Sequence, residues 1–519
     1  MTNSNAHNLL TDPVIRVEDR AGSQRALTLP GVLATLANGE DVMAFPGLRP
    51  HQWHAWHAFL VQIASMAMEG RTDEGQYSDA EWLPALRLLT GEYADDDPWC
   101  LAVSDLDQPA FMQPPVPEGS LKAFNGPHHA PDVSGLDVLV TTTQHDLKAG
   151  QQVYAHPDQW IFALIAYQTL NGYSSPGNYG VIRMNSGYGA RVLVGLAWSP
   201  EWADLFRRDL AILRSAHAQK KRAKRLDPSP RKLLWLSPWD GTTTIPWAEC
   251  DPYAVEIARR VRLSATGSDL SAYIRSTKVQ RVSPKSDLLK GQVDDPWIPI
   301  SEKGAAANVS ATGWRYDRVQ EMILGSGFHW PDCQQPQRND PRSLWFYAVG
   351  LAGGQGKTEG FHERWIPVPP PAAGRLFAPE PRRLLGDIAK EWVSRAGEAR
   401  NVFHRALVTL LASAGSNPNF NDYSDRRWLD RLTDEVDKVF FDTLWSVVDS
   451  PRQEQLAVWD RTLRKIIEDR LWPEAESEAP VADGRRERAQ ARAWFRLRGG
   501  LKKAIPHAYT QEDKPHADA

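Results

Sequence analysis

The chain has 519 residues, a formal net charge of −4 at pH 7, and 42% hydrophobic and 24% charged residues. This length is enough for two or three domains, and the composition is typical of a soluble globular protein. The net charge excludes a protein that is basic over its whole surface, so any surface for nucleic acid must be a local patch.

The cysteines and the N-terminal residues indicate where such a protein would work. Cys100, Cys250 and Cys333 form no CxxC pair, which supports neither a disulfide framework nor a cysteine-rich zinc site. Free thiols are compatible with a reducing cytoplasm. The opening residues MTNSNAHNLLTDP lack the pattern of a signal peptide, and no apolar stretch is long enough to cross a bilayer. We therefore expect a cytoplasmic protein that does not span a membrane.

The first predicted elements are a short strand, Val14–Glu18, and a helix from about His51 to Glu69. Helical spacing places apolar side chains of the second segment on one face, and Pro50 suits the start of a helix. The spacing of His51, His54 and His57 would also suit a metal ion, but no acidic or cysteine partner is nearby in the sequence. A structural role for these histidines is therefore favoured.

A glycine-rich stretch follows a second predicted helix, Asp158–Asn171, and reads NGYSSPGNYGVIRMNSGYGARVLVGL. Its glycines permit close approach of the backbone to a partner, and its other side chains provide donors, a stacking ring and a cation. The set suits the backbone or groove of a nucleic acid. A dinucleotide site is disfavoured, because a strand rather than a helix follows. The candidate residues here are Gly177, Asn178, Tyr179, Gly180, Arg183 and Asn185.

Basic residues are concentrated between Arg214 and Lys232, where eight Lys or Arg face one Asp. The run is interpreted either as a patch that contacts phosphates or as an ordinary solvated helix face or loop.

A second glycine-rich segment, FYAVGLAGGQGKTEGFHERW, contains Gly356, Lys357 and Thr358 in the order of a P-loop. A P-loop requires a glycine five positions before Gly356, where Leu351 stands, and a helix directly afterwards. The residues that follow are strand-like and end in prolines. The pattern therefore predicts two strands, 344–349 and 361–368, joined by a glycine-rich tip.

The tip of this predicted hairpin carries one long amide side chain, Gln355, among Gly353, Gly354 and Gly356. An amide on a narrow projecting hairpin can reach base edges or wedge between base pairs, while Lys357 contacts a phosphate. A surface hairpin without a binding role is the alternative on this stretch alone.

The proline-rich stretch 367–381 is predicted to be a linker that excludes helix and inner strand. Four segments with helical periodicity follow it. The predicted fold class is α+β, with an irregular mixed domain over residues 1–370 and an all-α four-helix bundle over 383–505. The four helical segments are 383–414, 425–448, 452–472 and 485–504.

Motifs for catalysis are missing from the sequence. It contains neither HExxH nor GxSxG, and no other arrangement of residues indicates an active site, so we do not expect an enzyme.

Several stretches, taken together and in order, resemble the CasA family, the large subunit of the type I-E CRISPR surveillance complex Cascade. The stretches are NLLTDPVIRV, FPGLRP (45–50), PAFMQP (109–114), GNYGVIRMNSGYG (177–189) and the hairpin with Gln355 before a helical C-terminal region. Each motif alone is weak, but their common order covers nearly the whole chain.

The resemblance implies a DNA-binding subunit of an RNA-guided antiviral complex that does not itself catalyse a reaction. Such a subunit recognises the protospacer-adjacent motif (PAM) on double-stranded target DNA and promotes strand opening. It also holds the 5′ handle of the crRNA, contacts other Cascade subunits, and provides a docking site for a helicase–nuclease. Because the zinc-binding cysteines of some members are missing, we expect no metal, and no cofactor is expected.

The resemblance also assigns roles to residues of this chain. Gln355 would be the family's wedge, and Lys303 its PAM-contacting lysine. The residues expected to contact DNA are Gly177, Asn178, Tyr179, Gly180, Arg183, Asn185, Lys303, Gly353, Gly354, Gln355, Gly356 and Lys357. A loop toward the crRNA handle would lie within 141–152 and include Thr141, Thr142, Thr143, Gln144, His145 and Lys148.

Two other functions stay open at this point. One is an NTP- or metal-dependent enzyme that uses the Gly356-Lys357-Thr358 loop. The other is a structural scaffold that joins subunits without reading DNA.

Overall fold

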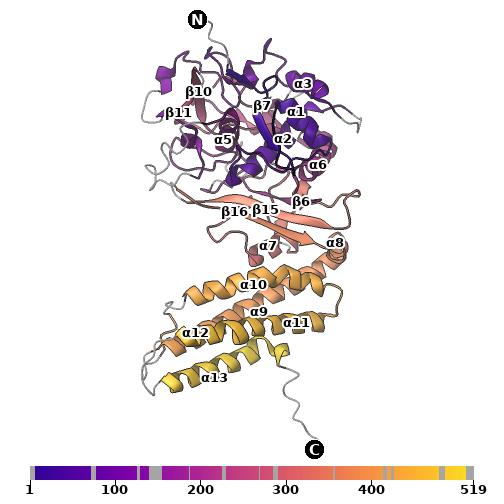
Figure 1. Cartoon of the computed structure of the whole chain (residues 1–519), viewed down its shortest axis with the longest axis vertical. Helices are drawn as coiled ribbons and strands as arrows, with labels where there is room; N and C mark the ends of the chain where they lie inside the picture. The colour runs from indigo at the N-terminus through magenta and orange to yellow at the C-terminus, as the bar shows by residue number, and fades with distance from the viewer. Residues whose placement is uncertain are drawn as a thin grey trace, which may run out of the picture. The chain divides into compact units, whose positions relative to one another are not determined.

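The chain forms two compact units in the computed structural model (Figure 1). The first contains Met1–Trp314 and Phe328–Pro367, and the second contains Arg315–Gly327 and Val368–Ala519. The structure describes residues 6–509, except 72–76, 125–128, 140–154, 186, 225–229, 268, 284–289, 326, 355–356, 413–417, 422–425 and 479–485.

The first unit mixes helices with small sheets, and the second is helical over its described residues. This confirms the predicted α+β class with a helical C-terminal region. The division into residues 1–370 and a four-helix bundle over 383–505 stays a prediction. Within the described residues, no helix combines the length and the apolar character needed to cross a membrane.

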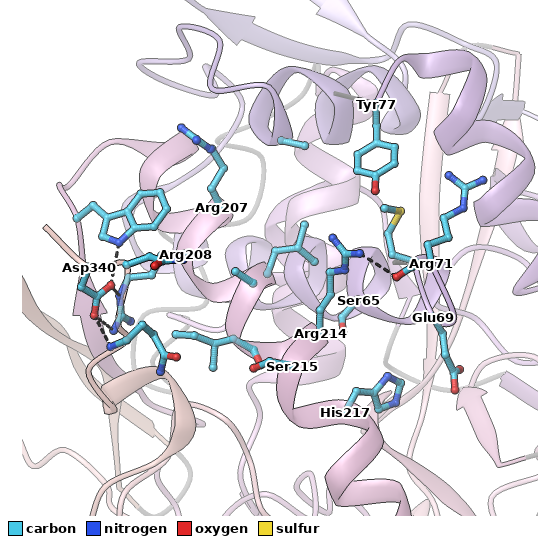
Figure 2. A pocket seen from close by; sticks show the side chains of 18 of the residues that line it. Ser65, Glu69, Arg71, Tyr77, Arg207, Arg208, Arg214, Ser215, His217 and Asp340 are labelled. Atoms are coloured by element: carbon cyan, nitrogen blue, oxygen red, sulfur yellow. Dashed lines mark hydrogen bonds and ion pairs between the residues drawn. The ribbon is translucent and has the colours of Figure 1, made fainter. Parts of the chain in front are cut away.

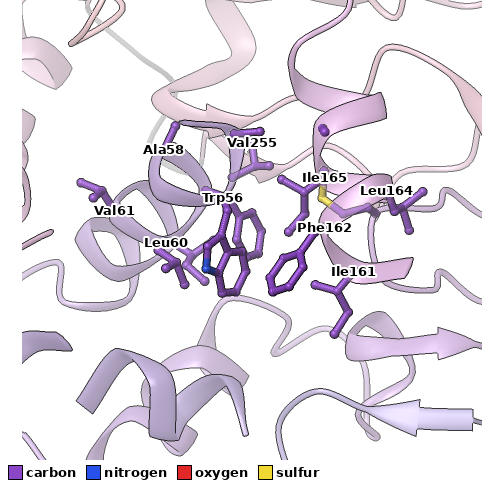
Figure 3. Packing of buried hydrophobic residues seen from close by; sticks show 14 of the residues in the cluster. Trp56, Ala58, Leu60, Val61, Ile161, Phe162, Leu164, Ile165 and Val255 are labelled. Atoms are coloured by element: carbon purple, nitrogen blue, oxygen red, sulfur yellow. The ribbon is translucent and has the colours of Figure 1, made fainter. Parts of the chain in front are cut away.

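The core of the first unit is built around two buried helices, α2 (Trp53–Ala67) and α5 (Pro157–Thr169). Both predicted helices are thus confirmed, and a 3₁₀ turn, Pro50–Gln52, leads into α2. Figure 3 shows side chains of both helices packed together, with the rings of Trp56 and Phe162 edge to face at 5.1 Å between centroids. Such buried aromatic pairs add to the stability gained from apolar burial. Three further helices of this unit are α1 (Leu29–Ala37), α3 (Asp79–Leu88) and α6 (Trp202–Lys224).

The three histidines of the first predicted helix are buried, and two of them pair with carboxylates from distant parts of the chain. His51 Nε2 lies 2.8 Å from an Asp137 oxygen, and His57 Nε2 lies 2.9 Å from an Asp209 oxygen. These contacts account for two polar rings inside a core, where an unpaired ring would be costly.

The sheet that carries the glycine-rich hairpin has the strand order β16–β15–β6 (Figure 1). β15 (Leu344–Gly354) is antiparallel to β6 (Leu193–Ala197), with Phe346 opposite Leu196. β15 and β16 (Lys357–Val368) confirm the predicted pair of strands, and both run further toward the glycine-rich tip than expected.

Within the part of the chain that the structure describes, the remaining strands form one three-stranded sheet and five two-stranded sheets. The three-stranded sheet has the order β10 (Arg260–Thr266), β11 (Asp269–Arg275) and β5 (His129–Ala130). The predicted strand Val14–Glu18 is confirmed as β2. The pairs are β1 (Ala6–Asn8) with β4 (Cys100–Ala102), β2 (Ile15–Glu18) with β3 (Gln24–Leu27), β7 (Arg231–Leu233) with β9 (Cys250–Val255), β8 (Ile245–Pro246) with β12 (Val282–Ser283), and β13 (Ile300–Ser301) with β14 (Phe328–His329).

The second unit consists of helices that pack against the long helix α9 (Pro379–Leu411). The rings of Trp392 in α9 and Trp459 in α11 stack at 4.5 Å between centroids, and Trp459 Nε1 donates to the Trp392 carbonyl. The other helices are α7 (Tyr316–Ile323), α8 (Pro370–Leu376), α10 (Arg426–Ser446), α11 (Arg452–Arg464), a π-helix (Lys465–Leu471), α12 (Trp472–Glu478) and α13 (Arg486–Ala504).

The predicted linker 367–381 is wrong in one respect, because it contains helix α8 and the start of α9. Pro370 and Pro371 stand in the first turn of α8, and Pro379 and Pro381 in the first turn of α9, where the N–H that proline lacks would have no partner within the helix. Here the prolines start helices instead of excluding them.

Candidate nucleic-acid interface

The residues from 171 to 190, here called the glycine loop, connect α5 to β6 and carry six of the predicted DNA contacts. Gly177 has a φ of +85°, and a Cβ at this position would lie 2.9 Å from Ser276 Cβ. The Asn178 N–H donates to the Ser175 carbonyl at 2.9 Å, and its Nδ2 donates to Ser175 Oγ at 3.0 Å. Gly177 and Asn178 therefore form a tight turn that glycine makes possible.

Gly180 is buried, and its backbone packs closely against another part of the glycine loop. A Cβ on Gly180 would lie 2.6 Å from the carbonyl carbon of Gly172, and a Cβ on Gly172 would lie 1.9 Å from the Gly189 carbonyl oxygen. The two ends of the loop therefore contact each other through backbone atoms, with no side chain between them. Gly180 supports the shape of the loop, and its burial removes it from the set of residues that contact DNA directly.

Side chains from outside the loop, the buried Arg259 and the half-buried Gln280, fix it further. Arg259 donates to the carbonyl oxygens of Gly172, at 3.2 Å, and Tyr179. Gln280 Nε2 donates to the Gly180 carbonyl at 2.7 Å. A loop held by several hydrogen bonds needs little ordering when it binds a partner, and this lowers the entropic cost of binding.

Three tyrosines lie together on the glycine loop. The ring of Tyr173 has its centroid 6.2 Å from that of Tyr179 and 5.8 Å from that of Tyr188. Tyr188 is 41% exposed, and the Tyr179 hydroxyl donates to the Lys278 carbonyl at 3.2 Å. Rings that are partly exposed and held in place can stack on bases or line a groove.

Arg183, predicted as a cation for DNA, is instead buried, with 1% of its surface exposed. Its Nη1 donates to Asp295 at 3.0 Å, and its Nε lies 3.0 Å from a Glu256 oxygen. Burial alone would raise the pKa of Asp295, but Arg191 and Arg183 hold that pKa below its usual value. The guanidinium is buried against these two carboxylates, so the prediction of a direct DNA contact is wrong for Arg183.

Asn185 also directs its amide into the protein. Its Nδ2 donates to the Ala306 carbonyl at 3.1 Å, and its Oδ1 accepts from the Gly187 N–H at 3.0 Å. Because both ends of the amide have partners, Asn185 positions the loop.

The hairpin stem and the glycine loop, which are far apart in the sequence, lie against each other. A Cβ on Gly353 would lie 2.0 Å from the carbonyl oxygen of Tyr188. Further down the stem, the Ala190 N–H donates to the Leu351 carbonyl at 3.3 Å. The structure therefore brings together the two glycine-rich segments that the sequence offered as separate candidates.

The tip residues Gln355 and Gly356 lie outside the residues that the structure describes. Gly354 ends β15, and Lys357 begins β16. Because a strand follows Lys357, the helix N-terminus that a P-loop places at the phosphate is not formed here. This geometry excludes the P-loop interpretation of Gly356-Lys357-Thr358.

Lys303 is exposed in a turn closed by the Gly304 N–H and the Ser301 carbonyl at 2.7 Å. The segment is joined to the glycine loop through Ala306, whose carbonyl binds Asn185 and whose N–H donates to the Lys290 carbonyl. The structure thus places the Lys303 turn beside the loop.

Two exposed lysines that sequence reasoning missed, Lys278 and Lys290, belong to segments that touch the glycine loop. Tyr179 binds the Lys278 carbonyl, and a Cβ on Gly291 would lie 2.6 Å from the Arg183 carbonyl oxygen. Neither lysine lies in a basic run or a motif, so only the folded chain shows that they flank the loop.

The residues predicted to face the crRNA handle, 141–148, lie outside the described part of the chain. Shortly before them in the sequence, the Val138 carbonyl accepts a hydrogen bond from Thr358 Oγ1 at 2.7 Å. The segment that leads into the predicted loop is therefore attached to β16.

Part of the basic run 214–232 is helical, and some of its cations form ion pairs with carboxylates. Arg214 and Lys220 belong to α6, and residues 225–229 lie outside the described part of the chain. Lys220 pairs with Asp332 at 2.7 Å, and Lys232 pairs with Glu69 at 2.9 Å. Pairing leaves less positive charge for a nucleic acid than the sequence alone suggests.

One group of side chains has the composition of a metal site. Glu69, His217 and Asp251 offer ligand atoms that lie within 4.8 Å of one another. The Lys232 ammonium, however, sits on the Glu69 carboxylate, and His217 Nε2 contacts both oxygens of Asp251. A cation is thus already supplied by the chain, and these contacts give the buried histidine a structural role.

No protein-family model and no curated protein match the sequence. Solved structures do match, over almost the whole chain. Cse1 of Thermobifida fusca is 16% identical, with a TM-score of 0.65 and coverage of 98% of this chain and 99% of that one. CasA of Thermus thermophilus is 13% identical, with a TM-score of 0.62 and coverage of 96% and 100%.

A third structure, the CRISPR-associated protein Cse1 of Acidimicrobium ferrooxidans, is 12% identical, with a TM-score of 0.62 and coverage of 97% and 99%. Each of these proteins is named Cse1 or CasA, so the fold agrees with the resemblance that the sequence motifs indicated. At these identities the likeness establishes the fold.

Proposed function

We propose that this chain, which has the CasA fold along its whole length, is a subunit of a type I-E Cascade and reads the PAM on target DNA. One observation carries the proposal. The glycine loop and the stem of the glycine-rich hairpin meet through backbone at Gly353 and Tyr188. Two segments with few side chains then form one surface, which can approach the edge of a duplex closely.

The glycine loop supplies the contacts that do not depend on the hairpin tip. Its turn at Gly177 and Asn178 is held in place, and Tyr179 is half-buried beside it. The exposed cations Lys278, Lys290 and Lys303 would contact phosphates around this turn. The pattern of donors and acceptors in the minor groove is degenerate, so such a surface would recognise a short and tolerant motif.

Strand opening is assigned to the hairpin tip. Gln355 would enter between the first base pairs beside the PAM, with Gly354 and Gly356 permitting close approach and Lys357 contacting a phosphate. A side chain that takes the place of stacking lowers the cost of unpairing, which is a few kcal/mol per step. The guide RNA would then read the remaining sequence by base pairing.

The other partners follow from the same assignment. The loop 141–148 would contact the crRNA 5′ handle, and other surfaces would bind Cascade subunits and the recruited helicase–nuclease. In this role the chain works by binding, and it is proposed not to be an enzyme. The role needs neither a metal nor a cofactor.

The test uses the complex reconstituted with guide RNA and a duplex that carries a fluorescent base analogue beside the PAM. Gln355→Ala is expected to slow the opening signal strongly, while non-specific duplex binding stays as in the wild type. Gln24→Ala, at a glutamine on the exposed strand β3, is the matched control and should have no effect.

A scaffold that never reads DNA is the rival function. It predicts that Gln355→Ala and Lys303→Gln leave both the binding and the opening of target duplex unchanged in a fully assembled complex. That result would overturn our proposal.

A further inference from the structure

A large cavity on the first unit lies among residues that have no part in the proposed reading of DNA. It has a volume of about 1050 Å³. Helix α6, the end of α2 with the residues that follow it, and the segment Gln337–Asp340 line it (Figure 2). This volume is slightly above the range of about 300–1,000 Å³ typical of pockets for small ligands, so it leaves room for a nucleotide-sized molecule.

Arginines dominate the charged lining of this cavity. Arg71, Arg207 and Arg338 are exposed, and among the described residues none of them forms an ion pair with a carboxylate. Arg207 lies over the Trp198 ring, with 5.5 Å from Cζ to the ring centroid. Arg71 lies 6.0 Å from the centroid of the Tyr77 ring. Stacking of this kind holds a guanidinium in place while its donors stay available.

The carboxylates in the lining are already neutralised by other cations. Glu69 pairs with Lys232 at 2.9 Å. Asp340 accepts two hydrogen bonds from Arg208, at 2.9 and 3.0 Å. Among the described residues the cavity therefore presents net positive charge, which favours an anionic ligand.

A buried hydroxyl gives a second, independent sign of a ligand. Ser65 on α2 lines the cavity with 1% of its surface exposed, and its Oγ has no hydrogen-bond partner among the described residues. Figure 2 shows Ser65 among the side chains that line the cavity. A buried hydroxyl without a partner is costly unless a ligand or a water satisfies it, and a phosphate oxygen would accept its proton.

The spacing of the arginines indicates what kind of anion would fit. Arg207 belongs to α6, Arg71 follows the end of α2, and Arg338 lies in the segment Gln337–Asp340, so the three cations come from different parts of the wall. Figure 2 shows Arg207 on one side of the cavity and Arg71 on the other, where Arg214 Nη2 donates to the Arg71 carbonyl at 3.0 Å. Cations at this separation suit a ligand with more than one phosphate group better than a single phosphate ion.

We propose that this cavity binds a ligand with at least two phosphate groups through Arg71, Arg207, Arg338 and the Ser65 hydroxyl. Free nucleoside triphosphates and single strands of nucleic acid share this chemistry. The proposal does not depend on the role assigned to the glycine loop, because none of its residues belongs to that loop or to the hairpin.

The test measures binding to the purified full-length chain by calorimetry and fluorescence anisotropy. The probes are inorganic phosphate, ATP without divalent cation, and a labelled dT12 strand. The double variant Arg207→Gln with Arg338→Gln should weaken binding of ATP or of dT12 by roughly tenfold or more. Arg405→Gln removes one exposed guanidinium from the helical unit and is the control, with an expected change below about twofold.

The outcomes separate the two sources of phosphate. Saturable binding of ATP that competes with dT12 identifies a nucleotide site, and binding of dT12 alone identifies a strand-binding site. Three results would overturn the proposal. They are no saturable binding of either ligand, an equal affinity for inorganic phosphate, or a loss of binding on Lys357→Ala that the cavity variants do not cause. Failure of DNA reading in the assembled complex would leave this test unaffected.

Discussion

Gly353 and Tyr188 touch through backbone, and a Cβ on Gly353 would lie 2.0 Å from the Tyr188 carbonyl oxygen. Such a distance is far inside van der Waals contact, and the atom opposite is backbone, which cannot rotate away. The contact joins the hairpin stem to the glycine loop. Its integrity should therefore decide whether the two segments can act on one duplex.

The first prediction concerns Gly353→Ala. The added methyl group should push the hairpin stem away from the glycine loop and lower the free energy of unfolding of the first unit by about 1–3 kcal/mol, as overpacking does. Thermal unfolding would measure the stability, and duplex binding by the assembled complex would measure the function. We expect PAM-dependent binding to fall more than non-specific binding.

Gly91→Ala is the matched control for this change. Its Cβ would meet only the Leu88 carbonyl oxygen, at 3.6 Å, which is an ordinary contact. Equal stability and equal PAM-dependent binding in both variants would contradict the importance of the contact between Gly353 and Tyr188.

The second prediction separates a buried cation from an exposed one. Arg183→Met leaves Glu256 buried without its guanidinium and removes one of the arginines that pair with Asp295, which keeps Arg191. Removing one partner of a buried ion pair costs about 3–5 kcal/mol. Lys303→Gln removes an exposed charge and should leave stability within about 0.5 kcal/mol. It should instead make the salt dependence of duplex binding shallower by about one unit of slope.

Thermal unfolding and a salt titration of duplex binding, performed on both variants, check these two statements. An Arg183→Met protein with unchanged stability would show that the buried ion pairs contribute little. An unchanged salt slope for Lys303→Gln would remove Lys303 from the proposed interface.

These two residues also illustrate what the sequence can predict and what it cannot. The helix around Trp56 and the strands of the hairpin follow from local periodicity, and both were found. Arg183 was misread because its carboxylate partner Asp295 is 112 residues away, and residue type alone does not distinguish a buried guanidinium from an exposed one. For the same reason, Lys278 and Lys290 carry no local signal of their place beside the glycine loop.

The contact between the glycine loop and the hairpin could not be predicted from the sequence either, because its two partners are far apart along the chain. Glycine composition indicates where backbone can approach closely, but it does not say which backbone will be opposite. The prolines of 367–381 show that residue type alone does not predict whether a segment excludes a helix or begins one. Proline is excluded from the interior of a helix but not from its first turn, and four of these prolines stand in the first turns of α8 and α9.

The third prediction concerns the cysteines, all of which are buried. Burial raises the pKa of Cys100 to about 12, and it raises the pKa of Cys333 well above its usual value. Only the thiolate reacts with iodoacetamide, and a thiol of pKa about 12 is ionised to about one part in ten thousand at pH 8. We expect almost no labelling of the native protein and full labelling in urea, measured by mass spectrometry. Fast labelling of Cys100 in the native state would contradict its burial.

The last prediction concerns pH and the buried ring of His54. Burial, followed by the nearby charges of His51 and Arg191, lowers the pKa of His54 to about 3. In the unfolded chain this ring takes up a proton near pH 6.5, whereas in the folded chain it stays neutral until about pH 3. The unfolded state therefore binds more protons in this interval, and folded-state stability is lost as the pH falls below 6.5, by roughly 1.4 kcal/mol per pH unit.

Urea unfolding at several pH values, compared between wild type and His54→Leu, measures the effect, with exposed His129→Gln as the control. Between pH 6.5 and 5 the variant should lose about 2 kcal/mol less stability than the wild type. Parallel curves for all three proteins would mean that His54 is not the group that titrates.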